Sequence, residues 1–179
     1  MIKRLLFAVL FTLSLSAYGQ DFPIDKSTGR IVYTDVIEAE GSKDELYNRA
    51  KEWIVDNFRS IDHVLEVDSK QSSQIIGKGA TRIEGEMDFF GFKSNALIGF
   101  TFKLNFKDGR YKYEFSDLRV KGLPDDGTDM PYEDIFFQEP NPKATKLAKK
   151  NHEKYKQSTH EMLTALEASL KTKMAEESW

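Results

Sequence analysis

The sequence predicts an α+β domain in which an antiparallel sheet carries an N-terminal helix and a long C-terminal helix on one face. Three observations predict this class. An amphipathic stretch with a helix-start signal lies at 43–58, an alternating hairpin surrounds 108–109, and a second amphipathic stretch runs from about 142 to 174. Helices at both ends of a run of antiparallel strands are typical of α+β domains, where they cover one side of the sheet. The expected order is β-α-β(n)-α.

Composition excludes several classes of protein. The 179 residues include 26 Lys and Arg, 29 Asp and Glu, and no Cys. Without cysteine the chain has no disulfide framework, no thiolate nucleophile and no zinc site built on sulfur. Its 12% aromatic content is too high for a disordered chain, and its length suits one domain with a sizeable core.

Residues 1–19 have the pattern of a secretory signal peptide. Lys3 and Arg4 precede an apolar run at 5–15, and small residues stand three and one positions before a cut ahead of Gln20. The run is shorter than the roughly 20 residues that span a bilayer, and no Cys follows for a lipid anchor. We therefore expect an exported protein, periplasmic or extracellular, which is not a lipoprotein.

The remaining residues, 20–179, are expected to form a single acidic domain. Residues 1–19 hold two cations and no anions, so removing them changes the net charge from −3 to −5. No later segment approaches membrane-spanning length, so we expect no membrane-spanning segment in the mature chain. An exported acidic protein has little reason to bind nucleic acid.

The first strand and helix are predicted from local patterns. β-branched residues at 30–39 indicate a strand. Ser42 and Glu45 have the spacing of a capping box, and apolar residues including Trp53 then recur on one face of a helix at about 43–58. Two further strands are expected at 64–67 and 74–84, with a turn at 71–73.

Gly77 and Gly79 lie on the same face of the strand expected at 74–84. The stretch 77–79 is too short for a phosphate-binding loop and lacks the Ser or Thr of that motif. We interpret the two glycines as room for a helix, in particular for Trp53.

The pair Asp108-Gly109 is the strongest local signal, because it suits a two-residue type I′ hairpin turn. Such a turn pairs Lys107 with Arg110 and places the aromatic residues of both strands on one side of the sheet. These residues are Phe100, Phe102, Phe106, Tyr111, Tyr113 and Phe115.

The same register places Asp117 opposite Phe100, on the apolar face. Either a bulge near Ser116 and Asp117 turns Leu118 inward again, or Asp117 is a carboxylate in an apolar environment. We favour the bulge.

Residues 121–142 form a connection of unusual length, rich in proline and acidic residues. Such a segment is commonly a lid, a binding loop or a strap. Its apolar residues, Tyr132, Ile135, Phe136 and Phe137, either pack onto the sheet or form an exposed anchor for a partner. Asn141 as the cap and Pro142 in the first turn predict that the C-terminal helix then runs from about 142 to 174.

Several segments carry a family resemblance. They are Phe22-Pro23-Ile24-Asp25, Thr28-Gly29-Arg30-Ile31, the stretch from Ser42 to Trp53, the stretch from Ile75 to Gly79, and the strand from Tyr111 to Arg119. Over about 22–120 the chain resembles the secreted bacterial family called domain of unknown function 4468, which is seen mainly in exported proteins of Bacteroidota. The resemblance implies a TBP-like fold. It implies no catalytic residues, because the family has no established activity, and it does not imply DNA binding, because function resides in sites.

The histidines and acidic residues support no cofactor, metal or catalytic site. His152 and His160 stand eight residues apart on the expected C-terminal helix, so a metal would need a third ligand, and solvent-facing positions explain them more simply. His63 has no Ser or carboxylate partner at a recognisable spacing for a hydrolytic triad. The acids at 125–129 depart from the EF-hand pattern and are interpreted as a solvated turn.

Six lysines crowd the first half of the C-terminal helix. Anionic lipid headgroups or acidic polysaccharide would attract them, but apolar residues opposite them are sparse before Tyr155. We interpret them as a solvated face. They are Lys143, Lys146, Lys149, Lys150, Lys154 and Lys156.

These observations favour a non-catalytic binding or accessory domain of the cell envelope, with an envelope protein or a small apolar ligand as partner. One alternative is a carrier that holds a small apolar ligand between the aromatic sheet face and the C-terminal helix, although the rings alone also explain a core. An envelope hydrolase is the weaker alternative, because no spaced acid/base set is present. The candidate contact residues are Tyr132, Ile135, Phe136, Phe137, Asp117, Phe100 and Tyr113.

Overall fold

The computed structural model describes residues 22–176, except 89, 122–126, 128 and 140. The expected signal peptide at 1–19 lies outside the described residues. So does most of the acidic stretch at 125–129.

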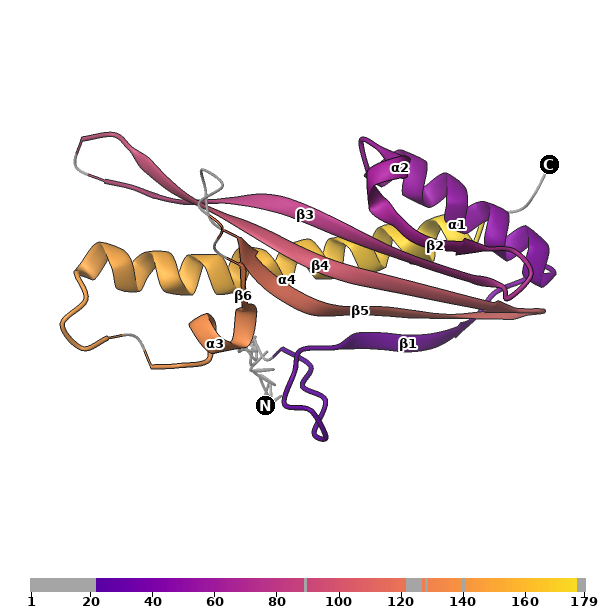
Figure 1. The fold of residues 1–179 in the computed structure, drawn as a ribbon, viewed down its shortest axis with the longest axis horizontal. Helices are drawn as coiled ribbons and strands as arrows, with labels where there is room; N and C mark the ends of the chain where they lie inside the picture. The colour runs from indigo at the N-terminus through magenta and orange to yellow at the C-terminus, as the bar shows by residue number, and fades with distance from the viewer. Residues whose placement is uncertain (1–21, 89, 122–126, 128, 140, 177–179) are drawn as a thin grey trace, which may run out of the picture.

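The strands form one antiparallel sheet in the order β1-β5-β4-β3-β2, and β6 adds to the β1 side of β5 (Figure 1). The edge strand β1 therefore pairs with a strand that is far away in sequence. The strands are β1 (Tyr33–Glu38), β2 (Leu65–Ser69), β3 (Gln74–Met87), β4 (Lys93–Lys107), β5 (Arg110–Lys121) and β6 (Asp129–Pro131).

Two of the four helices in the described residues are long, and both lie along the same face of the sheet (Figure 1). The helices are α1 (Lys43–Asn57), α2 (Ile61–Val64), α3 (Tyr132–Phe136) and α4 (Lys146–Met174). Among the described helices, none is long and apolar enough to cross a membrane. The short elements α2, α3 and β6 were not predicted, because three to five residues are too few to show a periodicity.

The start of α1 confirms the predicted capping box. The Ser42 hydroxyl accepts a hydrogen bond from the backbone N–H of Glu45, and the Glu45 carboxylate accepts one from the backbone N–H of Ser42 at 2.7 Å. The helix then buries Trp53, whose ring lies edge-on to that of Phe102 with centroids 5.8 Å apart. The capped start thus orients the helix so that its apolar face meets the aromatic face of the sheet.

The start of α4 differs from the prediction, whereas its end at Met174 agrees. Thr145 is the N-cap, and its hydroxyl accepts a hydrogen bond from the backbone N–H of Ala148 at 3.1 Å. The Asn141 side chain instead accepts from the backbone N–H of Lys143 at 2.9 Å, which closes a separate turn. Asparagine favours such local turns as strongly as it favours helix caps, so its presence alone does not fix a helix start.

The hairpin register is confirmed, but the turn type is not. Lys107 pairs with Arg110, and the aromatic positions of the two strands face one another as predicted. A type I′ turn needs positive φ at both central residues; φ is +75° at Gly109, and Asp108 is not among the described residues with positive φ. Tertiary contacts explain the difference, because Asp108 accepts from the backbone N–H of Lys43 at 2.8 Å and the Gly109 N–H donates to the Gly41 carbonyl at 2.9 Å.

The bulge predicted near Asp117 is present. The β4–β5 register shifts between Gly99 and Thr101, Asp117 has φ of +50°, and Leu118 is buried. The Asp117 side chain is 58% exposed, so the alternative of a carboxylate in an apolar environment is wrong. The bulge absorbs one extra residue and restores the inward direction of the strand.

The two strand glycines make room for rings rather than for a helix. A Cβ at Gly77 would collide with the ring of Phe102, and one at Gly79 would collide with the ring of Phe100 and lie 2.8 Å from Phe58. The rings of β4 thus fold over the neighbouring strand β3, where no side chain stands in the way. This packing fills the space beneath α1.

Candidate functional site

The candidate residues of the 121–142 segment lie in α3 and just after it. Tyr132 and Phe136 are buried with ring centroids 4.4 Å apart, and Ile135 is half-buried against the core. Phe137 remains partly exposed and packs against the ring of Phe22 at 6.0 Å. Most of the apolar surface of this segment therefore belongs to the folded body, and a contact with a partner remains a prediction for Phe137 in particular.

A buried carboxylate that was not predicted anchors this segment. Glu133 accepts a hydrogen bond from the backbone N–H of Ile31 at 2.8 Å and forms an ion pair with Arg30 at 3.0 Å. Because Glu133 is almost fully buried, both partners are needed to offset its desolvation. No local pattern could show this contact, because its two sides are about a hundred residues apart in sequence.

The other candidate residues are not gathered at the same place. Phe100 and Tyr113 are buried in the sheet face beneath the helices, each next to the ring of Phe115. Asp117 lies at the bulge, near Arg119, beside a shallow hollow of about 230 Å³. The structure thus distributes the candidate residues over three separate regions.

A row of polar contacts joins α4 to the sheet. The Tyr33 hydroxyl lies 2.6 Å from His160 Nδ1, and the Tyr113 hydroxyl donates to Glu167 at 2.6 Å. Lys171, one turn further along α4, pairs with Glu167 at 2.6 Å. His160, Glu167 and Lys171 follow the helical spacing of one face, but this spacing alone does not distinguish them from solvent-facing residues.

Burial raises the pKa of the tyrosines in this row and that of the neighbouring Tyr111. Burial raises the pKa of Tyr111 to about 12, and it raises those of Tyr33 and Tyr113 above their usual range. For Tyr113 the Glu167 carboxylate adds to the effect, since it accepts the hydrogen bond of the neutral phenol. These tyrosines therefore keep their protons at neutral pH, and Tyr113 donates its proton in the hydrogen bond to Glu167.

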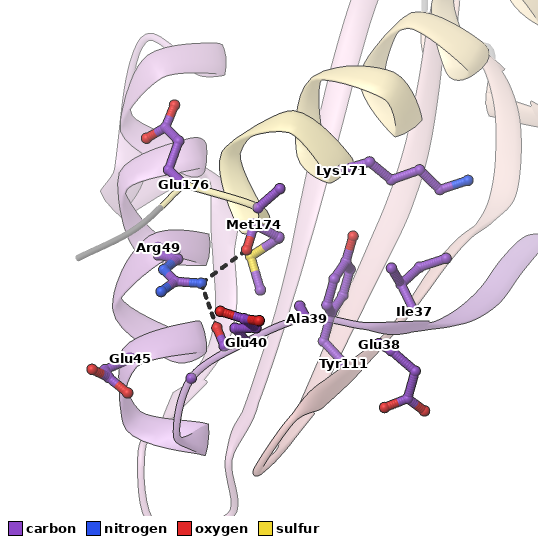
Figure 2. Close-up of a pocket in the computed structure, with 12 residues that line it drawn as sticks. Ile37, Glu38, Ala39, Glu40, Glu45, Arg49, Tyr111, Lys171, Met174 and Glu176 are labelled. Carbon is purple, nitrogen blue, oxygen red and sulfur yellow. Dashed lines mark hydrogen bonds between the residues drawn. The ribbon is translucent and has the colours of Figure 1, made fainter.

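A pocket of about 510 Å³ lies where α1, the end of α4 and the end of β1 meet (Figure 2). The Arg49 guanidinium donates to the carbonyls of Glu40 at 2.7 Å and Met174 at 2.9 Å, and so joins the three elements. Two other charged groups at its wall have partners: Lys171 pairs with Glu167, and Glu176 pairs with Lys173. This pocket is best explained as the junction that closes the helical layer.

The histidines lie in different environments from those expected. His152 packs against the ring of Phe136 at 5.2 Å, and His160 bonds Tyr33, so neither is a plain solvent-facing residue. His63 Nδ1 lies 2.7 Å from the Ser60 hydroxyl, a partner that sequence spacing had not identified. Within the described residues, no group of three or more side chains is placed to hold a metal ion.

The largest exposed apolar side chains gather at one place, the tip of the β3–β4 hairpin. Met87 is 57%, Phe90 80% and Phe92 72% exposed. We call these three residues the hairpin tip. The hairpin extends beyond the rest of the sheet at the end where α4 begins (Figure 1). This site was not predicted from the sequence, although several Phe residues in a connection between two strands are an unusual composition for a turn.

Comparisons with known proteins agree with the fold. Residues 33–121 match the family described as a domain of unknown function (DUF4468) with TBP-like fold. A crystal structure of a DUF4468 family protein from Bacteroides ovatus ATCC 8483 is 15% identical, covers 89% of this chain and 93% of that one, and has a TM-score of 0.66. A crystal structure of a TBP-like protein from Parabacteroides distasonis ATCC 8503 is 19% identical, covers 84% of this chain and 96% of that one, and has a TM-score of 0.60.

No curated protein matches the chain. The two crystal structures share the fold along most of the chain, including regions beyond residues 33–121. The antiparallel sheet with its long C-terminal helix is therefore a TBP-like α+β fold, and over residues 33–121 the chain is similar to the DUF4468 family.

Proposed function

We propose that this protein is an exported, non-catalytic binding domain of the bacterial cell envelope, and that the hairpin tip is its contact site. The observation that carries the proposal is the exposure of Met87, Phe90 and Phe92 at one protruding turn. Exposed apolar side chains that cluster in this way are costly in water and mark interaction sites. Single exposed apolar residues elsewhere, such as Val55, need no such explanation.

The state of the polar groups supports a non-catalytic role. Glu167 is bonded by Tyr113 and Lys171, and Glu133 is bonded by Ile31 and Arg30, so these carboxylates serve packing. The Ser60–His63 pair stands at the start of a four-residue helix and is exposed. The two bonded carboxylates and the Ser60–His63 pair all lack the geometry of an activated nucleophile with an oriented base. We therefore do not propose the hydrolase alternative.

The carrier alternative has less support than the hairpin tip. The rings of Phe58 and Phe102 stack at 5.3 Å, and Trp53 packs edge-on against both. These contacts fill the space beneath α1, and Leu163, Leu170 and Met174 of α4 are fully buried in the same core. Side chains therefore occupy the space between the aromatic sheet face and the C-terminal helix that an apolar ligand would need. We therefore place the contact site at the tip.

Export is supported by the charged start, apolar run and small residues of 1–19 and by the family resemblance. We expect Edman sequencing or mass spectrometry of protein recovered outside the cytoplasm to find Gln20 as the first residue. A cytoplasmic product that retains Met1 would contradict export.

A fluorescent reporter tests the contact site directly. The chain has no cysteine, so Met87→Cys introduces one labelling position for an environment-sensitive dye. Adding the envelope fraction of the source bacterium, both membranes and soluble extract, should shift the emission of this reporter to the blue. A dye at Val55→Cys, on α1, is the matched control and should not respond. If neither fraction changes the Met87 reporter, the proposed contact site is wrong.

A further inference from the structure

We propose that the hairpin tip docks on the surface of an anionic lipid bilayer, with its rings in the headgroup layer and the lysines at the start of α4 against the anionic groups. This inference rests on the proposed function, because it names the partner of the same tip.

Hydrogen bonds hold the backbone that carries Phe90 and Phe92. The Asp88 carboxylate accepts hydrogen bonds from the backbone N–H groups of Phe90 at 2.9 Å and Phe92 at 2.8 Å. The Asp88 N–H donates to the Phe92 carbonyl at 2.8 Å, and Gly91 has φ of +84°. Because these bonds already hold the backbone at Asp88 and at 90–92, binding costs little additional backbone conformational entropy there.

The first half of α4 lies beside the hairpin just behind its tip. Lys150 and Lys154 form ion pairs with Glu86 at 2.9 and 3.3 Å. The Asn151 side chain accepts from the Glu86 N–H at 2.6 Å, and the Tyr155 hydroxyl donates to Ser94 at 2.7 Å. These contacts fix the lysine-rich end of α4 next to the apolar tip.

The charge at this end is opposite to that of the whole chain. Residues 141–156 contain six lysines and one glutamate, whereas the chain has a net charge of −3. Lysines within a Debye length of a bilayer strengthen binding to anionic lipids, and several act together. Aromatic rings at a loop tip favour the interfacial layer of a bilayer. There the rings contact apolar chains while neighbouring lysines contact anionic headgroups. The first half of α4 has few apolar residues opposite its lysines, and the hairpin tip supplies the apolar contact in their place.

The shape of the site favours a bilayer over a protein surface. Three side chains on a protruding turn offer far less than the roughly 800 Å² that each partner buries in a stable protein interface. A soft headgroup layer can close around such a tip without a matching cavity. A symmetric pair of copies would bring the two lysine clusters together, and their repulsion opposes that contact.

Vesicle binding tests the inference. The full processed protein, labelled at Met87→Cys, is titrated with phosphatidylcholine vesicles that contain or lack about a third phosphatidylglycerol. We expect at least about tenfold tighter binding to the anionic vesicles, and a several-fold weakening when NaCl rises from about 0.1 to 0.5 M, because salt screens the lysines. Equal binding to both vesicle types, or no binding to either, would overturn the lipid assignment.

Paired variants separate the two parts of the site. Phe90→Ser with Phe92→Ser should weaken vesicle sedimentation at least about tenfold, whereas Val55→Ser should leave it unchanged. Lys146→Gln with Lys149→Gln should weaken it several-fold, whereas Lys103→Gln with Lys112→Gln, on the sheet face opposite the helices, should not. Unchanged circular dichroism and melting temperatures establish that each variant is folded. Equal effects of site and control variants would contradict the inference.

The reporter distinguishes failure of this inference from failure of the proposed function. A response of the Met87 dye to soluble envelope extract, without a response to anionic vesicles, would leave the tip as a contact site but assign it to a protein. Silence towards both would overturn both proposals.

Discussion

The Tyr113 hydroxyl donates a hydrogen bond to Glu167 at 2.6 Å, and so joins β5 to the second half of α4. Lys171 completes this contact, since its ammonium pairs with Glu167 and lies 5.5 Å from the centre of the Tyr113 ring. The neighbouring Tyr111 hydroxyl is also buried, but it has no hydrogen-bond partner among the described residues. Two tyrosines on one strand therefore differ in what their hydroxyl groups contribute to stability.

Removing each hydroxyl should have opposite effects on the free energy of unfolding. Tyr113→Phe removes one of the two donors to Glu167, the other being Lys171, and should cost about 1.5–3 kcal/mol, the range for hydrogen bonds to charged groups. Tyr111→Phe removes a buried group that bonds nothing, and should be neutral or stabilise by up to about 1 kcal/mol. Urea unfolding of both variants measures the difference. Similar losses in the two would contradict the contacts described.

The alternation of β4 makes a second prediction. Phe102 is fully buried and contacts Trp53 and Phe58, so Phe102→Ala should cost about 3–5 kcal/mol through lost burial and the cavity that remains. Lys103, one position along, points to the opposite face, and Lys103→Ala should change stability by no more than about 0.5 kcal/mol. Denaturant melts that give equal losses would refute the register.

The strand glycines make a third prediction. An alanine at Gly79 would place its Cβ against the rings of Phe100 and Phe58, so Gly79→Ala should destabilise by about 1–3 kcal/mol. Gly99 is the matched control, because the tightest contact of a Cβ there would be with the flexible Lys121 side chain, at 3.0 Å, and the Gly79 carbonyl oxygen lies at an ordinary 3.8 Å. Thermal unfolding should therefore show a large loss for the first variant and a small one for the second.

The start of α4 makes a fourth prediction. Thr145→Ala removes the cap of the helix and should cost about 1 kcal/mol. Asn141→Ala removes only a turn outside the helix and should cost less. Chemical denaturation distinguishes the two variants. A greater loss of stability for Asn141→Ala would show that Asn141 is the cap and that the helix starts at residue 142.

The capping box of α1 makes a prediction about pH. Hydrogen bonds from Ser42 lower the pKa of Glu45 in the folded protein. A carboxyl whose folded pKa is lowered stabilises the fold above its unfolded pKa, and this contribution is lost as the pH falls through the folded value. Glu45→Ala should therefore be less stable than the native chain at pH 7, and the gap should close towards pH 3. A gap that is constant across this range would contradict the role of the charge.

Local signals predicted most of the fold. The Ser42–Glu45 spacing, the alternation around Asp108-Gly109 and the extra residue at Asp117 each concern neighbours in sequence or in a hairpin, where geometry follows directly from spacing. The predictions that were wrong concern contacts between residues that are distant in sequence. The turn type at Asp108 is set by contacts with Gly41 and Lys43, and the room at Gly79 is filled by a ring from the next strand.

The candidate site was harder to predict than the fold. Tyr132 and Phe136 have the composition of an exposed anchor, but the distant bond between Glu133 and Ile31 holds their segment against the body. At the β3–β4 turn the reverse holds, because Phe90 and Phe92 resemble core residues by composition and yet lie beyond the sheet that could bury them. Burial of an aromatic residue in a connection is decided by where the rest of the chain passes, which one sequence does not show.

The place of β1 at the edge of the sheet has a consequence for folding kinetics. Tyr33 pairs with Phe115, so the first described strand to be synthesised finds its partner β5 only after β2, β3 and β4 have emerged. Pairings of such large sequence separation slow folding, because a long loop must close before any contact rewards it. The β3–β4–β5 meander can form from neighbouring strands alone, and β1 must then add to its exposed edge as a late step.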